Sequence, residues 1–198
     1  MSARLKADAE VSSLLAAGRY VVAKSGYEGL KVPLVMAKAG LSSRAFYRHF
    51  ASKDELLLAM HDAEIDALVE RLVRATDAEP GRAVGAWMRA LVRVVYDRRT
   101  SNPQHFAVTQ WGALATRFPD DVAGQLERVL APLVAAIEAG VEGGSMHSEN
   151  PRGDAVGILS LCQGVLFCGV LPGRLPHADA IAMCDRFATA VLGCAVDD

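Results

Sequence analysis

Basic, aromatic and hydroxyl side chains are concentrated in one short segment of the chain, SSRAFYRHFASK at residues 42–53. The planar guanidinium of an arginine such as Arg44 or Arg48 can bind O6 and N7 of a guanine together, which reads the base. The hydroxyl, imidazole and ammonium donors of Tyr47, His49 and Lys53 can reach phosphate oxygens, which position a protein without reading sequence. This spacing of donors predicts a surface that binds a nucleic acid. The alternative is an ordinary solvated helix face.

Charge is distributed unevenly along the chain, although the net charge of its 198 residues is only −2. Residues 1–53 contain nine Lys and Arg against three Asp and Glu, whereas residues 54–198 contain twelve against twenty. A compact basic segment joined to an acidic remainder is expected when one part of a protein binds a polyanion and the rest does not. The overall composition, 52% hydrophobic and 22% charged, is that of a folded globular protein and excludes a disordered chain.

Short helices around the basic segment would position its donors. Glycine, proline and capping residues predict helices at about 11–26, 32–39 and 42–50, with a glycine turn between the last two. Phe46 and Phe50 would anchor the inner side of the third helix, so that its other side turns outward. Such a pair of helices is a helix-turn-helix, whose second helix lies in the DNA major groove. We therefore expect base contacts from Ser43, Arg44, Ala45 and Arg48, and phosphate contacts from Ser42, Tyr47, His49 and Lys53.

The rest of the chain is also predicted to be helical, because the sequence lacks strand alternation and hairpin turns. Ser52 and Glu55 form a capping box that begins a helix at 52–76, and Leu58, Ile65, Leu68, Leu72 and Val73 are its expected apolar positions. Further helices are expected at about 81–100, 103–116, 120–141, 154–171 and 177–195, with a loop at 141–153. The predicted fold class is all-α with about nine helices. Its domains are residues 1–51 and 52–198, with 52–76 as the connecting helix.

Apolar residues surround nearly the whole segment at 155–171, which only Ser160 and Gln163 interrupt. A helix of this kind must be covered on several sides. A second copy of the chain could cover one of them in a two-fold dimer, and burial within one subunit is the alternative. The segment is short, contains three glycines and has no basic flank, so we do not expect it to span a membrane. The expected interface residues are Val156, Leu159, Gln163, Leu166, Met183, Phe187 and Val191.

The stretch from about Ala9 to Leu58, and above all GLSSRAFYRHFASKDEL, resembles the DNA-binding domain of the TetR family of bacterial transcriptional regulators. The resemblance covers about a quarter of the chain. It implies an all-α dimer with an N-terminal three-helix helix-turn-helix domain. It also implies a larger C-terminal helical domain that binds a small molecule and dimerises through its last two helices.

Carried over by position, the family's phosphate contacts fall on Tyr47, His49 and Lys53, and its base-reading positions fall on residues 43–45 and 48. The chain departs from the family at three places. Lys31 precedes the second helix where Ser or Thr is usual, and we expect it to contact phosphate as a point charge. Met36 and Ala45 stand where alanine and threonine are common, so the family's usual operator contacts do not transfer without change.

The favoured function is that of a cytoplasmic, dimeric regulator, a repressor that leaves a palindromic operator when a small, largely apolar effector binds. The effector pocket would be lined by Trp87, Leu91, Tyr96, His105, Phe106, Gln110, Trp111, Gln163 and Phe167. Two alternatives stay open, a helical small-molecule-binding protein and a ligand-independent DNA-binding protein.

The sequence contains no nucleophile motif, phosphate-binding glycine loop or paired catalytic carboxylates, so we expect no enzyme activity. We also expect no cofactor and no metal site. His61, Glu64 and Asp66 are interpreted as a solvated surface rather than as metal ligands.

Overall fold

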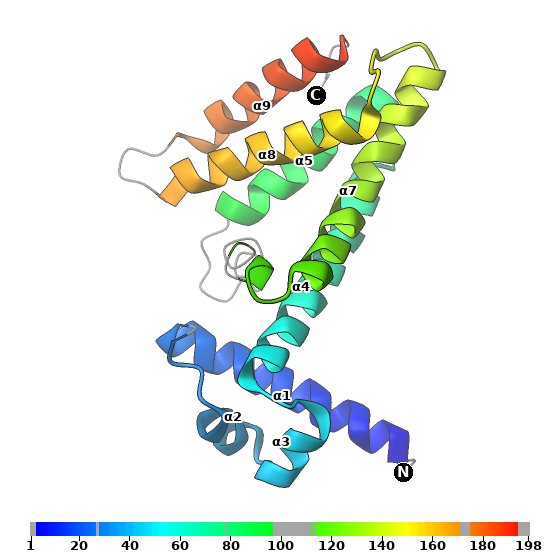
Figure 1. The fold of residues 1–198 in the computed structure, drawn as a ribbon. Coiled ribbons are helices and arrows are strands. Elements are labelled where there is room, and N and C mark those ends of the chain that lie inside the picture. The colour runs from blue at the N-terminus through cyan, green and yellow to red at the C-terminus, as the bar shows by residue number, and fades with distance from the viewer. Residues whose placement is uncertain are drawn as a thin grey trace. The chain divides into compact units, whose positions relative to one another are not determined.

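The computed structural model describes residues 3–26, 28–77, 79–96, 112, 114–170 and 175–193 (Figure 1). Within these ranges the chain forms eight α-helices and no strand, which confirms the predicted all-α fold. Contacts divide it into an N-terminal unit, residues 1–64, and a C-terminal unit, residues 65–198. The division falls inside helix α4, Lys53–Ala75.

The N-terminal unit contains α1, Ala3–Ser25, α2, Val32–Ala39, and α3, Ser43–His49, followed by the first part of α4. Its helices end where the sequence predicts. Gly26 and Gly40 both have a φ of +67°, a left-handed conformation that glycine adopts without steric cost and that ends a helix.

The core of the N-terminal unit is formed where α1 packs against α2 and α3 and where it meets α4. Leu14 and Val21 of α1 are buried in this core, as is Val35 of α2. Gly18 permits a close approach, because a Cβ at this position would lie 2.5 Å from Sδ of Met60 on α4. The unit is thus a compact platform from which α3 can be presented.

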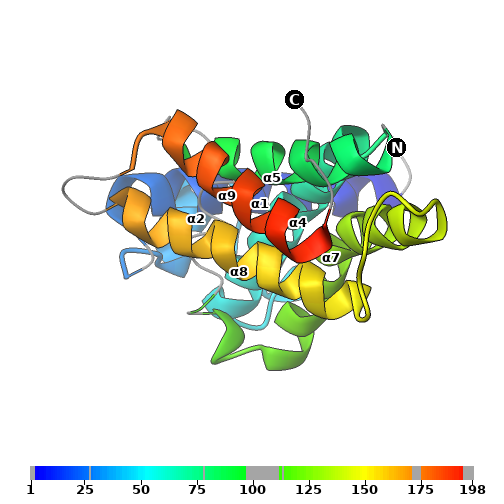
Figure 2. The same cartoon turned by 90° about the horizontal axis from the view of Figure 1, so that it is seen from above.

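The C-terminal unit contains α5, Pro80–Tyr96, α7, Pro119–Glu142, α8, Pro151–Val170, and α9, His177–Leu192, besides the end of α4. Helix α5 packs against all three of the others, and α8 and α9 lie side by side (Figure 2). The apolar residues of α5 are accordingly buried, namely Ala83, Val84, Trp87, Met88, Leu91, Val92 and Val94.

Three predicted boundaries and one predicted burial change in the structure. Helix α1 begins at Ala3 rather than near 11. Helix α9 ends at Leu192 rather than near 195, because Gly193 follows it in a left-handed conformation with a φ of +65°.

Helix α8 begins at Pro151 rather than near 154, because the side-chain oxygen of Asn150 accepts a hydrogen bond from the Gly153 N–H (3.0 Å) and proline suits a first helical turn. Val73 is 52% exposed rather than an inward position of α4. Most of the helix predicted at 103–116 lies outside the described residues. No helix in the described ranges is long and apolar enough to cross a membrane.

Candidate nucleic-acid interface

Helix α3 has one buried and one exposed side. Ser42 caps it by accepting a hydrogen bond from the Ala45 N–H (3.3 Å), so the helix begins where predicted. Phe46 is completely buried, and the Phe50 side chain is buried next to it with ring centroids 5.8 Å apart. The exposed residues are Ser43, Arg44, Tyr47 and Arg48. They form one continuous stripe, because residues four apart along a helix lie on the same face.

Tyr47 is a large exposed side chain of α3, at 60%. Its ring packs edge to face on Phe46, with centroids 5.2 Å apart, so a buried ring supports an exposed one. The phenol group is therefore presented from a fixed base, which suits a contact with a phosphate oxygen.

Ala45 does not belong to the exposed stripe, and the prediction that it turns outward is wrong. It is 4% exposed and faces the core with Phe46. The helical period explains this, because residues 45, 46 and 49 follow the inner side when 43, 44, 47 and 48 follow the outer one. Base contacts can therefore come from Ser43, Arg44 and Arg48, and this role remains a prediction for them.

Glu10 of α1 lies against the last turn of α3, a contact that sequence reasoning missed. The His49 ring nitrogen Nε2 is 2.8 Å from Oε2 of Glu10, and a guanidinium nitrogen of Arg48 is 3.6 Å from the same oxygen. The hydrogen bond with His49 is the largest cause that lowers the pKa of Glu10, and the charges of Arg48 and Lys6 act in the same direction. The carboxylate is therefore ionised and accepts from Nε2–H.

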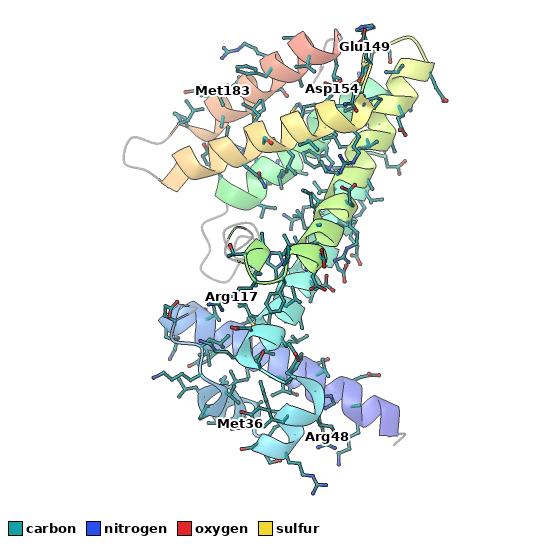
Figure 3. All side chains as sticks on the ribbon, in the orientation of Figure 1. Met36, Arg48, Arg117, Glu149, Asp154 and Met183 are labelled. Atoms are coloured by element: carbon teal, nitrogen blue, oxygen red, sulfur yellow. The ribbon has the colours of Figure 1, made fainter. Side chains whose placement is uncertain are left out.

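The other predicted DNA contacts occupy separate places in the N-terminal unit. Lys31 is exposed just before α2 and gives that helix no side-chain cap. Lys53 is the first residue of α4 and is half-buried. Arg44 is exposed and has no ion-pair partner among the described residues. Arg48 has a side chain that is 57% exposed, and it is labelled beside α3 in Figure 3.

The start of α4 is held by the predicted capping box. The Ser52 hydroxyl accepts a hydrogen bond from the Glu55 N–H (3.1 Å), and the Glu55 carboxylate accepts one from the Ala51 N–H (2.7 Å). The return bond thus goes one residue before the usual capping position. It fixes the chain between α3 and α4, and with it the position of Lys53.

Further along α4, His61 and Glu64 are buried, so their interpretation as a solvated surface is wrong, whereas Asp66 is exposed. Glu64 is paired with Arg19 of α1, whose Nε lies 2.5 Å from the Glu64 carboxylate oxygen. Burial raises the pKa of Glu64, and the Arg19 charge opposes that rise. The described residues contain no group of His, Cys, Asp and Glu that could hold a metal ion.

The residues predicted to line an effector pocket are only partly described. Trp87 and Leu91 are buried on α5, and Nε1 of Trp87 has no hydrogen-bond partner among the described residues. The Tyr96 hydroxyl donates to the Leu175 carbonyl (2.7 Å), so it is already engaged. Gln163 is half-buried on α8. His105, Phe106, Gln110 and Trp111, and the side chain of Phe167, lie outside the described parts.

A groove of about 580 Å³ lies elsewhere in the C-terminal unit, between α7 and the ends of α4 and α5 that meet there. None of the residues predicted for the pocket lines it. Small and apolar side chains dominate its wall, and sequence reasoning missed it because alanines and prolines carry no chemical signature. Its lining is Val69, Val73, Thr76, Pro80, Ala83, Arg128, Ala131, Pro132, Ala135, Ala136 and Ala139.

The expected dimer residues separate into exposed and buried positions. Phe187 is 54% exposed and Val191 nearly as much, one turn apart on α9. Leu159 is buried within the subunit, so its prediction as an outward position is wrong, because that side of α8 packs on the core. Val156, Gln163 and Met183 are half-buried, and the Leu166 side chain lies outside the described ones.

The N-terminal unit has the geometry of a helix-turn-helix domain, with α2 and α3 joined by a glycine turn and a basic stripe facing outward from α3. Residues 14–60 match the sequence profile of the bacterial regulatory proteins of the tetR family. Residues 14–60 are therefore a helix-turn-helix domain of the TetR type.

Known regulators are similar to this chain in sequence and in fold. The HTH-type transcriptional regulator Rv1816 of Mycobacterium tuberculosis is 30% identical over 149 residues, which are 73% of this chain. The chain spans 62% of the length of that relative.

The same fold is found in SmeT, the repressor of the Stenotrophomonas maltophilia multidrug efflux pump SmeDEF, with a TM-score of 0.73 and 16% identity over 95% of this chain and 93% of SmeT. The reduced form of Escherichia coli NemR has a TM-score of 0.71 and 19% identity over 92% of this chain and 97% of NemR.

Proposed function

We propose that this chain is a sequence-specific regulator of transcription that binds double-stranded DNA as a homodimer, with α3 of each copy in a major groove. It acts as a repressor and leaves its palindromic operator when a small, largely apolar molecule binds the C-terminal unit. One observation carries the proposal: Ser43, Arg44, Tyr47 and Arg48 form an exposed stripe that Phe46 and Phe50 support from behind.

The residues of this stripe suit the two kinds of DNA contact. Arg44 and Arg48 lie one turn apart, which matches successive bases on one edge of a groove, and arginine pairs best with guanine. Tyr47 lies on the same exposed side and can reach the backbone, together with Lys53 at the start of the next helix. The similarity to a curated HTH-type regulator supports the same function.

The exposed surface of α8 and α9 supports a homodimer. Phe187 and Val191 would be covered by a second copy, which removes apolar area from water. On α8, Gly157 and Gly164 are exposed, and a Cβ at either position would have no neighbour within 4 Å among the described residues. The packing of the subunit therefore does not require these glycines, whereas the close approach of another helix would.

An effector site near Trp87 is supported by the buried indole N–H, which is without a partner among the described residues. A buried donor of this kind costs free energy unless it is paired, and a ligand acceptor could pair it. Trp87, Met88 and Leu91 suit an apolar or aromatic molecule. Binding there releases DNA only if the molecule prefers the conformation that fits the operator less well.

Selection of bound duplexes from random DNA tests the proposal. A palindrome with half-sites one helical turn apart, or a multiple of it, is the expected result, since two α3 helices related by a two-fold axis need that spacing. Selection of no common sequence would contradict the regulator and favour a helical small-molecule-binding protein.

A further inference from the structure

We infer that Glu10 is a positioning residue that determines the DNA specificity of this protein, because it holds Arg48 and His49 of α3 in one arrangement. The inference rests on the proposed DNA-binding function. A carboxylate beside a surface that meets phosphates is unfavourable by simple charge, so its presence there calls for a physical role.

The geometry supplies that role. One carboxylate oxygen, Oε2 of Glu10, lies 2.8 Å from Nε2 of His49 and 3.6 Å from a guanidinium nitrogen of Arg48. The Glu10 side chain is 11% exposed and that of His49 12%, so water competes little for the bond between them. A hydrogen bond to an ionised acceptor in such a place is stronger than one in water.

The contact decides what each basic side chain can do. His49 donates Nε2–H to Glu10 and so braces α3 against α1, and this nitrogen is then not available for the phosphate contact predicted for His49. Arg48 keeps most of its guanidinium exposed while one edge faces Glu10. An arginine side chain that is already ordered loses less conformational freedom when it pairs with a base. An arginine whose charge is partly balanced by a carboxylate is also attracted less strongly to the phosphates of any DNA.

Glu10 should therefore weaken binding to arbitrary DNA more than binding to the operator. Glu10→Gln keeps the size of the side chain and an oxygen that can accept from His49, but it removes the charge that holds Arg48. Asp8→Asn is the matched control, because Asp8 is an exposed carboxylate on the same helix and the substitution changes the net charge equally.

The experiment measures Kd for the selected operator and for a random duplex of equal length, at several salt concentrations, with the full-length protein and both variants. We expect Glu10→Gln to bind the random duplex more tightly, with a salt slope steeper by up to about one phosphate contact. The ratio of the two Kd values should fall at least about fivefold, which is the lower end of the discrimination given by one base contact. Asp8→Asn should leave the ratio within about twofold.

Three results overturn the inference. One is an unchanged ratio in Glu10→Gln. Another is an equal fall in Asp8→Asn, since it would mean that net charge alone matters. The third is an equal loss of affinity for both duplexes in a protein that unfolds at a lower temperature, since it would mean that Glu10 only stabilises the fold. A wild-type protein that selects no operator contradicts the proposed function itself, before Glu10 is tested.

Discussion

Replacement of Phe46 by alanine tests whether the buried ring holds α3 in place. The side chain is completely buried, with one ring neighbour at 5.2 Å and another at 5.8 Å. Truncation of a buried phenylalanine to alanine costs about 3–5 kcal/mol of unfolding free energy. A folded unit of 64 residues has about 3–10 kcal/mol in total, at roughly 0.05–0.15 kcal/mol per residue. The variant should therefore lose about a third or more of the stability of the N-terminal unit, and all of it if that stability lies at the lower end of the range.

Hydrogen exchange in the full-length protein measures this loss where it occurs. Amides of α1 and α3 should exchange at least about a hundredfold faster in Phe46→Ala, since 3 kcal/mol corresponds to roughly two powers of ten. The core amides of α5 and α7 serve as the internal reference. Binding to the selected operator should fall together with the protection of α3.

Tyr47→Phe is the control variant on the neighbouring residue. Tyr47 is mostly exposed, so removal of its hydroxyl should change the unfolding free energy by no more than about 0.5 kcal/mol. It should still weaken DNA binding by about the same factor on every sequence, because a phosphate contact carries no sequence information. A loss of less than about 1 kcal/mol in Phe46→Ala, or equal losses in the two variants, would refute the reasoning.

Three other predictions concern separate features. Arg44→Ala should cost about 1–3 kcal/mol at one base pair of each half-site in a binding assay on single-substitution operators, whereas Lys53→Ala should weaken all of these operators alike. Glu64→Gln should flatten the dependence of stability on pH: burial raises the folded-state pKa of Glu64, so the wild type loses stability as pH rises from the usual glutamate pKa to the folded one. Denaturant titrations of both proteins across that range would show it, and parallel curves would contradict it. Phe187→Asp should convert a dimer into a monomer in light scattering, since it places a charge on the exposed apolar side of α9, and an unchanged mass would exclude that face as the interface.

Local signals were sufficient for α2 and for the caps of α3 and α4, whereas α1 begins at Ala3, well before its first predicted residue. Helix α2 runs from Val32 to Ala39 as predicted, because a proline in its first turn and a left-handed glycine at its end act within a few residues of chain. The caps at Ser42 and Ser52 were likewise predicted from residues three positions apart. The start of α8 was not, because the capping residue Asn150 was interpreted as part of a loop.

The candidate site was predicted in its outline and corrected in its details. The aromatic spacing of Phe46 and Phe50 indicated the inner side of α3, and the stripe of Arg44, Tyr47 and Arg48 followed from it. Ala45 was misplaced because its small side chain is compatible with either side of a helix, and burial alone distinguishes them. On α8, the near absence of polar residues hid the buried side that contains Leu159.

By itself, the sequence determined that every element in the described ranges is a helix, where most of these helices end, and that one segment is basic. Caps, turns and helical periodicity depend on neighbours along the chain, which is why the sequence contains them. Only the tertiary structure decided the contacts between helices distant in the chain. Glu10 approaches His49 across 39 residues, Arg19 approaches Glu64, and the groove beside α7 forms where three helices meet. The physical reason is that these contacts depend on how helices rotate and approach each other in the packed core, and no periodicity within one segment carries that information.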